Sequence, residues 1–183
     1  MLEINNQDDI FKNPSDIYTF WLTSLDIISL MNDPDNFNRL RNDFFVGLTP
    51  RELIEKLENE LNLEVVLSML ATIEAIFRLE LIYYVKIKPK EKITRQIRLE
   101  FKQFIDGRNV QEDKIRLEDI LKVFREIHPE IAKALSKLKE YFQYRHWLAH
   151  GRYGKIQYWT IPDPVDIYML FETISENICF RSL

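Results

Sequence analysis

The sequence predicts an all-α fold with little or no strand. Apolar residues recur at helical spacing in several segments. Only 4 Gly and 7 Pro occur in 183 residues, too few for the many tight turns of an all-β fold. Aromatic side chains make up 13% of the chain and supply bulk for a sizeable core. The length fits one domain over residues 1–183, with residues 1–13 as a ragged N-terminal segment.

The first helices are predicted from apolar spacing between breakers. A helix is expected over residues 15–31, where the larger apolar side chains share one face. The run Asn32-Asp33-Pro34-Asp35 ends it. A short helix is then expected over residues 37–45, ending near Gly47.

A strong start signal follows for a long helix. Thr49 can cap the helix, Pro50 has the preset φ of a first helical turn, and Glu52 can close a capping box. The helix is expected to run towards Lys86, with a break near residues 59–62. Its apolar stripe comprises Val66, Met69, Leu70, Ile73, Ile76 and Phe77.

The second half of the chain is expected to contain more helices. A helix-turn-helix-like pattern centres on Asp106-Gly107, and His128-Pro129 ends one helix and starts the next, over residues 130–150. Residues 155–161 are interpreted as a short strand or an extended loop. Pro162 and Pro164 precede a last helix over residues 165–179.

Cysteine content and hydropathy exclude several classes of protein. With Cys179 as the only cysteine, an intramolecular disulfide and a Cys-based zinc cluster are excluded. The N-terminal residues are acidic and polar, unlike a secretory signal. The best apolar run, residues 65–73, stops at Glu74, which is too short for a membrane span. A cytoplasmic protein without membrane contact is expected.

The net charge of −4 hides an asymmetry. Residues 1–80 hold 6 Lys or Arg against 15 Asp or Glu, whereas residues 81–183 hold 19 against 14. The overall acidity argues against a general DNA coat. A local basic surface on the second half still allows contact with phosphates, because such contact depends on the local field.

The segment richest in candidate chemistry is Tyr141–Gly154, at the end of a predicted helix. Leu135, Leu138 and Phe142 continue by helical steps to Arg145, so a guanidinium interrupts an apolar stripe. Such a group must find a partner, or face a cleft or a subunit interface. Gly151 stands where a helix can stop in the left-handed conformation.

This segment allows three interpretations. In the first, a capping His and a solvated Arg merely end a helix. In the second, the His-x3-His spacing of His146 and His150 forms a metal site, but the Glu of a zincin motif is absent. In the third, an imidazole beside a permanent cation carries out acid–base cleavage of a phosphodiester without a metal. We expect no metal and no cofactor.

Arg145, four intervening residues and His150 resemble the signature of HEPN-domain ribonucleases, all-α proteins of toxin–antitoxin and phage-defence systems. His146, directly after the Arg, matches the polar position of that signature, and Ala149-His150-Gly151 matches its helix end. The likeness covers residues 15–180 and implies an up-and-down helical bundle with additional helices. It implies a metal-independent endoribonuclease that cleaves RNA by attack of the ribose 2′-hydroxyl, with Arg145 and His150 as catalytic residues and His146 as an auxiliary residue.

Residues after the motif extend the expected site. Arg152 and Lys155 are expected to hold flanking phosphates, and Tyr153 is a second auxiliary residue that stacks on a base or packs in a loop. HEPN toxins with a minimal nucleotidyltransferase antitoxin often carry a Tyr two residues after the His. Here Arg152 occupies that position and Tyr153 follows one residue later, so the chain departs from the subgroup in which that Tyr receives AMP. The resemblance still implies a cognate antitoxin as a partner, for example a minimal nucleotidyltransferase.

Two further predictions concern helpers and partners. Glu74 and Arg78 stand four apart in the long helix, either as a surface ion pair or as a polar pair that supports the site. A homodimer is expected, because the resemblance implies it and because Tyr141, Phe142 and Trp147 offer aromatic surface. The alternative is that these aromatic side chains pack within the monomer. The rival function is a non-catalytic module of HEPN type that binds a protein or nucleotide.

Overall fold

A computed structural model describes residues 13–40, 47–86, 92–108, 115–149, 161–178 and 180. The predicted all-α class is confirmed, since these residues form helices and no strand. The 3-10 helices η1 (Leu30–Asn32) and η4 (Pro129–Ile131) precede α2 and α6. In chain order the α-helices are α1 (Pro14–Ser29), α2 (Pro34–Leu40), α3 (Pro50–Lys86), α4 (Lys92–Arg108), α5 (Leu117–Ile127), α6 (Ala132–Ala149) and α7 (Pro164–Ser175).

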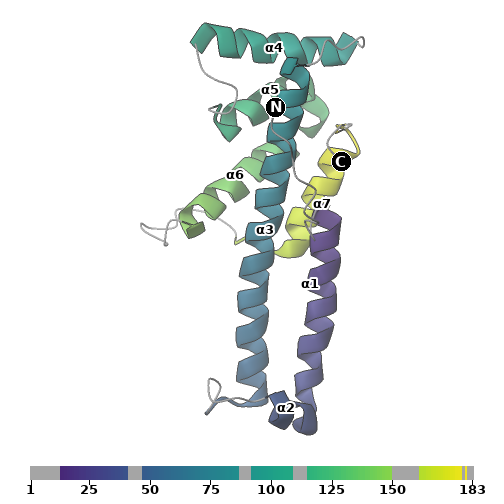
Figure 1. The fold of residues 1–183 in the computed structure, drawn as a ribbon, viewed down its shortest axis with the longest axis vertical. Helices are drawn as coiled ribbons and strands as arrows, with labels where there is room; N and C mark the ends of the chain where they lie inside the picture. The colour runs from purple at the N-terminus through teal and green to yellow at the C-terminus, as the bar shows by residue number, and fades with distance from the viewer. Residues whose placement is uncertain are drawn as a thin grey trace.

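Helix α3 is the axis against which most of the other helices pack (Figure 1). Its predicted capping box is formed: the Glu52 carboxylate accepts from Thr49 N at 2.8 Å, and Glu52 N donates to Thr49 Oγ1 at 3.3 Å. The break predicted near residues 59–62 is wrong, because α3 is continuous over 37 residues. Asn62 accepts a hydrogen bond from Trp21 Nε1 of α1 at 2.7 Å, and such tertiary contact overrides weak local helix propensity.

The two halves of α3 have different surroundings. Its first turns run beside α1 and η1, and these segments together with α2 form an elongated arm, residues 22–40 and 47–58 (Figure 1). Its second half contacts α4, α5, α6 and α7, and α4 lies across the far end of the molecule. We call this second part, residues 66–86 with α4, α5 and α6, the head.

Two predicted helix boundaries agree with the structure to different degrees. The division at His128-Pro129 is confirmed, since α5 ends at Ile127 and η4 begins at Pro129. The helix-turn-helix-like pattern around Asp106-Gly107 is confirmed in outline, since α4 ends at Arg108 and α5 begins at Leu117, but both residues still belong to the end of α4. A Gly in a helix costs only about 1 kcal/mol relative to Ala. The buried side chains of Ile97 and Phe101 hold α4 against α3 and α5 and offset that cost.

The remaining helix predictions agree approximately with the structure. The predicted helix over 37–45 overlaps α2, and its residues 41–45 lie outside the described residues. So do residues 155–160, for which a strand or loop is predicted, whereas Ile161 is irregular. Asp163 caps α7 by accepting from Val165 N at 2.7 Å.

The core joins α3 to the helices that carry the site. The six residues of the predicted stripe on α3 are all at most 3% exposed. Phe77 of α3 meets Phe124 of α5 edge to face, with ring centroids 5.3 Å apart. Leu135 and Leu138 anchor α6 in the same core. Close packing of these buried side chains fixes α3, α5 and α6 relative to one another.

Candidate functional site

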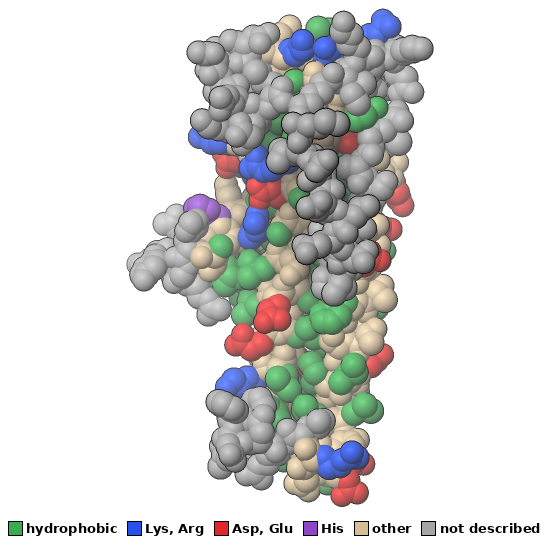
Figure 2. Space-filling model, in the orientation of Figure 1, with side chains coloured by type: hydrophobic (Ala, Val, Ile, Leu, Met, Phe, Trp, Pro, Cys, Tyr) green, Lys and Arg blue, Asp and Glu red, His purple; other side chains and the backbone are tan. Residues whose placement is uncertain are grey.

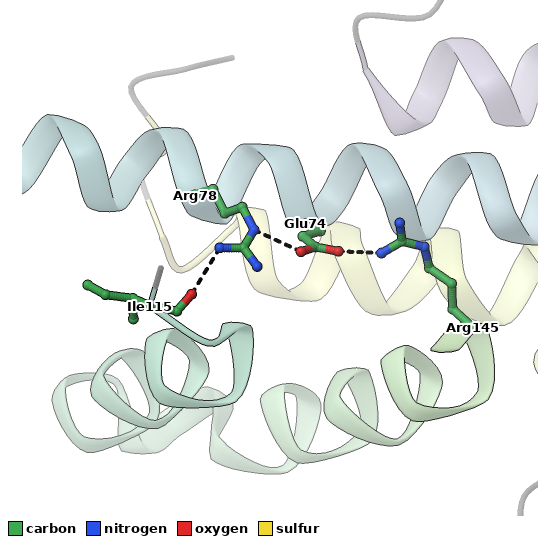
Figure 3. Close-up of polar contacts among 4 residues, drawn as sticks. All are labelled: Glu74, Arg78, Ile115 and Arg145. Carbon is green, nitrogen blue, oxygen red and sulfur yellow. Dashed lines mark hydrogen bonds and ion pairs between the residues drawn. The ribbon is translucent and has the colours of Figure 1, made fainter. Parts of the chain in front are cut away.

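The catalytic arginine predicted from the sequence lies between two helices. Arg145 belongs to the penultimate turn of α6, and its side chain is 31% exposed. Its Nη1 donates to the carboxylate of Glu74 on α3, as Figure 3 shows. The guanidinium that interrupts the apolar stripe of α6 therefore has a specific partner, 71 residues earlier in the chain.

Glu74 binds a second arginine with its other carboxylate oxygen. Arg78, one turn further along α3, donates from Nε to Glu74 Oε1 at 2.8 Å. Its Nη1 donates to the carbonyl oxygen of Ile115, just before α5, at 3.0 Å (Figure 3). The predicted pair of Glu74 and Arg78 is thus formed, and it also connects α3, α5 and α6. We call Glu74, Arg78 and Arg145 the triad.

The electrostatics of the triad keep Glu74 ionised. Partial burial acts to raise the pKa of Glu74, but hydrogen bonds from Arg78 and Arg145 and their positive charges outweigh it. The net result is a pKa below the ordinary glutamate value. Two cations around one carboxylate leave the triad with a net positive charge.

The triad forms part of a groove of about 930 Å³ between α3, the start of α5 and α6. Besides Arg78 and Arg145, the cations Arg116 and Lys139 line it, against the carboxylates of Glu74 and Glu118. Lys139 Nζ lies 3.5 Å from Glu118 Oε1. Figure 2 shows basic, acidic and histidine side chains meeting in this part of the surface. Because cations outnumber carboxylates here, the lining favours an anionic ligand. We call this the cationic groove.

His146 also lines the cationic groove, from an exposed position on α6. It lies next to Arg145 in the chain and shares its groove. His128 lies elsewhere, with its Nδ1 3.0 Å from Glu130 Oε1 where α5 ends. His128 therefore belongs to a helix junction and not to the site.

Several predicted site residues lie outside the described residues, namely His150, Arg152, Tyr153 and Lys155. His150 follows Ala149, the last residue of α6, which lines the cationic groove. The structure thus brings together Glu74, Arg78, Arg145 and His146 from the predicted set.

The aromatic surface expected to drive dimerisation is mostly internal. Tyr141 and Phe142 are 5% and 9% exposed and belong to the core, and Trp147 packs partly against it. The alternative of packing within the monomer is therefore the correct one for these rings. The reason is geometric: α6 crosses α3, so its aromatic side turns inward.

Two groove residues were missed by sequence reasoning. Arg116 directly precedes α5, and Lys139 lies in the middle of α6. Each belongs to a stretch of mixed charges that is typical of solvated helix faces, so no local signal marked it. Only the packing of α5 beside α6 brings both to the groove of Arg145.

Comparison with known proteins adds no relative. No protein-family model matches the chain, and neither the curated proteins nor the solved structures give a match. In the part of the chain that the structure describes, no three His, Cys, Asp or Glu side chains cluster as metal ligands would. No described helix combines the length and apolar character needed to cross a membrane.

Proposed function

We propose that the protein is a metal-independent endoribonuclease of HEPN type and the toxin of a bacterial toxin–antitoxin or phage-defence system. The observation that carries the proposal is the position of Arg145. Its guanidinium is held by a carboxylate from another helix, beside a histidine and inside a groove whose lining has four cations against two carboxylates. A cation fixed in this way suits stabilisation of negative charge on a reacting phosphate.

The proposed reaction uses the RNA itself as nucleophile. The ribose 2′-hydroxyl loses its proton to a general base and attacks the adjacent phosphorus, and the bond to the 5′-oxygen breaks as that oxygen gains a proton. The products are a 2′,3′-cyclic phosphate and a 5′-hydroxyl. His150 is the proposed acid–base residue, since imidazole titrates near neutral pH. Arg145 stabilises the phosphorane-like transition state, and His146 orients the phosphate.

Glu74 and Arg78 are the proposed positioning residues. A free arginine side chain samples many rotamers, and its ordering opposes catalysis entropically. Glu74 holds one edge of the Arg145 guanidinium, which orients the remaining N–H groups. Arg78 holds Glu74 in turn and is itself anchored on Ile115 O at 3.0 Å. This chain of contacts fixes the cation before the substrate binds.

The partners proposed are RNA, a second copy of the chain and a cognate antitoxin. In an ideal helix Arg145 and His150 lie about 140° apart, which disfavours one compact site within a single chain. A two-fold axis beside the end of α6 pairs each Arg145 with the other subunit's His150. Mixing separately purified Arg145→Ala and His150→Ala proteins restores part of the activity if sites are composite. A fully active monomer contradicts this arrangement.

The test of the activity uses purified protein and total RNA. Cleavage is expected in EDTA, with 2′,3′-cyclic phosphate ends, while DNA remains intact because it lacks the 2′-hydroxyl. His150→Ala is expected to abolish cleavage with an unchanged helical circular dichroism spectrum. Cleavage that EDTA stops and Zn²⁺ restores, or a fully active His150→Ala protein, contradicts the proposal.

A second candidate function is a non-catalytic module that binds a nucleotide or a protein. The observation that favours it is that Arg145 is already paired with Glu74, which partly neutralises the cation. The Glu74→Gln variant distinguishes the ribonuclease from the binding module. If Glu74 positions a catalytic Arg145, RNA cleavage falls about tenfold in kcat with little change in KM. A binding module shows no cleavage in either protein, and its affinity for anions rises when the carboxylate is removed.

A further inference from the structure

A second cavity adjoins the cationic groove at Trp147. It has a volume of about 380 Å³ and is formed by α3, α6 and the segment that leads into α7. Trp147 lines both this cavity and the cationic groove, so the two sites adjoin. The lining residues described for it are Asn59, Asn62, Leu63, Val66, Tyr144, Trp147, Ile161, Pro162, Asp163 and Pro164. We call it the neutral cavity.

The chemistry of the neutral cavity differs from that of the groove. No cation is among its described lining residues, and the Asp163 carboxylate is engaged in capping α7. Its walls are mainly apolar and include two aromatic rings, Tyr144 and Trp147, with centroids 5.9 Å apart. Among these described side chains a phosphate finds no cation, whereas a flat uncharged ring can stack there.

Two amides give the cavity polar specificity. Asn62 Oδ1 accepts from Trp21 Nε1 at 2.7 Å, so its oxygen is oriented towards α1 and its amide nitrogen is the donor for another partner. Asn59, one turn earlier on α3, is exposed and adds a second amide. Amides beside an aromatic wall recognise the hydrogen-bonding edge of an unpaired nucleobase.

We propose that the neutral cavity binds one unpaired RNA base whose phosphate lies in the cationic groove. This inference rests on the proposed function and deepens it, because it gives the enzyme a base preference. The cavity volume falls within the range of pockets that enclose small ligands. Trp147, at the boundary, contacts the base on one side while the adjacent phosphate meets Arg145 on the other.

The test compares ligands that differ only in the base. Ribose 5-phosphate and the four ribonucleoside 5′-monophosphates are titrated by calorimetry at low salt. At least one nucleotide is expected to bind about tenfold tighter than ribose 5-phosphate, the gain typical of stacking one base. Equal affinities for all five ligands overturn the cavity assignment while leaving phosphate binding by the groove intact. Absence of binding by every ligand overturns both.

Substitutions then test whether the base-dependent gain in affinity comes from the neutral cavity. Asn59→Trp fills the cavity from α3 and is expected to remove the base-dependent gain without changing the affinity for ribose 5-phosphate. Ser68→Trp is the matched control, because Ser68 is exposed on the opposite face of α3. Asn59→Leu is the second variant in case the indole destabilises the fold. A gain that persists in a folded Asn59→Trp or Asn59→Leu protein places the base elsewhere and overturns the proposal.

Discussion

The arm and the head of this molecule share helix α3 but differ in charge and in how they use polar residues. The arm carries six carboxylates against three cations, and its polar side chains mostly cap helices or face solvent. In the head, Glu74, Arg78 and Arg145 are partly buried, and Glu74 binds Arg78 of its own helix and Arg145 of α6. One continuous helix therefore carries an acidic surface at one end and, at the other, part of a groove in which cations outnumber carboxylates.

Among changes that compare head and arm, removal of the Arg145 side chain in the head is expected to have the largest effect on RNA cleavage. Arg145→Ala leaves the developing charge on the phosphate without its fixed cation, and kcat for RNA cleavage is expected to fall at least about 100-fold. The measurement is single-turnover cleavage of a labelled RNA. Arg51→Ala, an exposed arginine of the arm, is the matched control and retains full activity. Equal losses in the two proteins would contradict a special role for the head.

Charge reversal in the groove is expected to have the next largest effect. Arg116→Glu combined with Lys139→Glu replaces two cations of the groove lining, and RNA binding at 0.1 M salt is expected to weaken about tenfold. The slope of log Kd against log salt should fall by about one for each phosphate that the variant no longer neutralises. Arg51→Glu with Lys56→Glu makes the same change on the arm and leaves the slope unaltered. A groove variant with the wild-type slope moves the RNA path elsewhere.

The predicted phosphate-binding residues Arg152 and Lys155 allow a further comparison. Charge reversal at these two positions is expected to weaken RNA binding in the same way, with the same fall in slope for each phosphate. If only this pair changes the slope, the RNA path follows the segment after α6. If both pairs change it, the path includes the cationic groove as well.

Glu74 gives the head a stability that depends on pH. Because the pKa of Glu74 is lowered in the folded protein, the unfolded chain binds more protons at acidic pH, and this stability is lost as pH falls through the folded pKa. At pH 7, Glu74→Gln is expected to lower the free energy of unfolding by about 1–2 kcal/mol. Near pH 3 the difference should shrink. Urea unfolding at both pH values measures it, with the exposed Glu55→Gln of the arm as control.

The sequence predicts local features of this fold well and long-range ones poorly. The capping box at Thr49, the apolar stripe of α3 and the division at His128-Pro129 depend on neighbouring residues, and all three are confirmed. At Asn62, where a break is predicted, α3 is continuous, and the Asn62 side chain accepts a hydrogen bond from Trp21, 41 residues earlier, a contact that local spacing does not reveal.

The same distinction applies to the candidate site. The stripe on α6 showed that the Arg145 guanidinium needs a partner, a cleft or an interface, but periodicity within one helix could not name Glu74 on another. Arg116 and Lys139 had no signal at all, because their relevance arises only when α5 packs beside α6. A motif within one segment is readable from sequence, whereas a groove between segments is a product of the tertiary fold.

The smallest expected effect concerns the arm. Thr49→Ala removes the hydroxyl that accepts from Glu52 N at 3.3 Å, and loss of such a cap typically costs about 1 kcal/mol. Because the arm contributes no described residue to the cationic groove, RNA affinity and cleavage rate should stay at wild-type values after correction for folded fraction. Thermal unfolding and RNA cleavage are measured on the same preparation. A Thr49→Ala protein that unfolds earlier yet cleaves normally shows that the arm stabilises α3 without taking part in the chemistry. If cleavage falls in the fully folded protein, the start of α3 is coupled to the triad and the separation of arm from head is wrong.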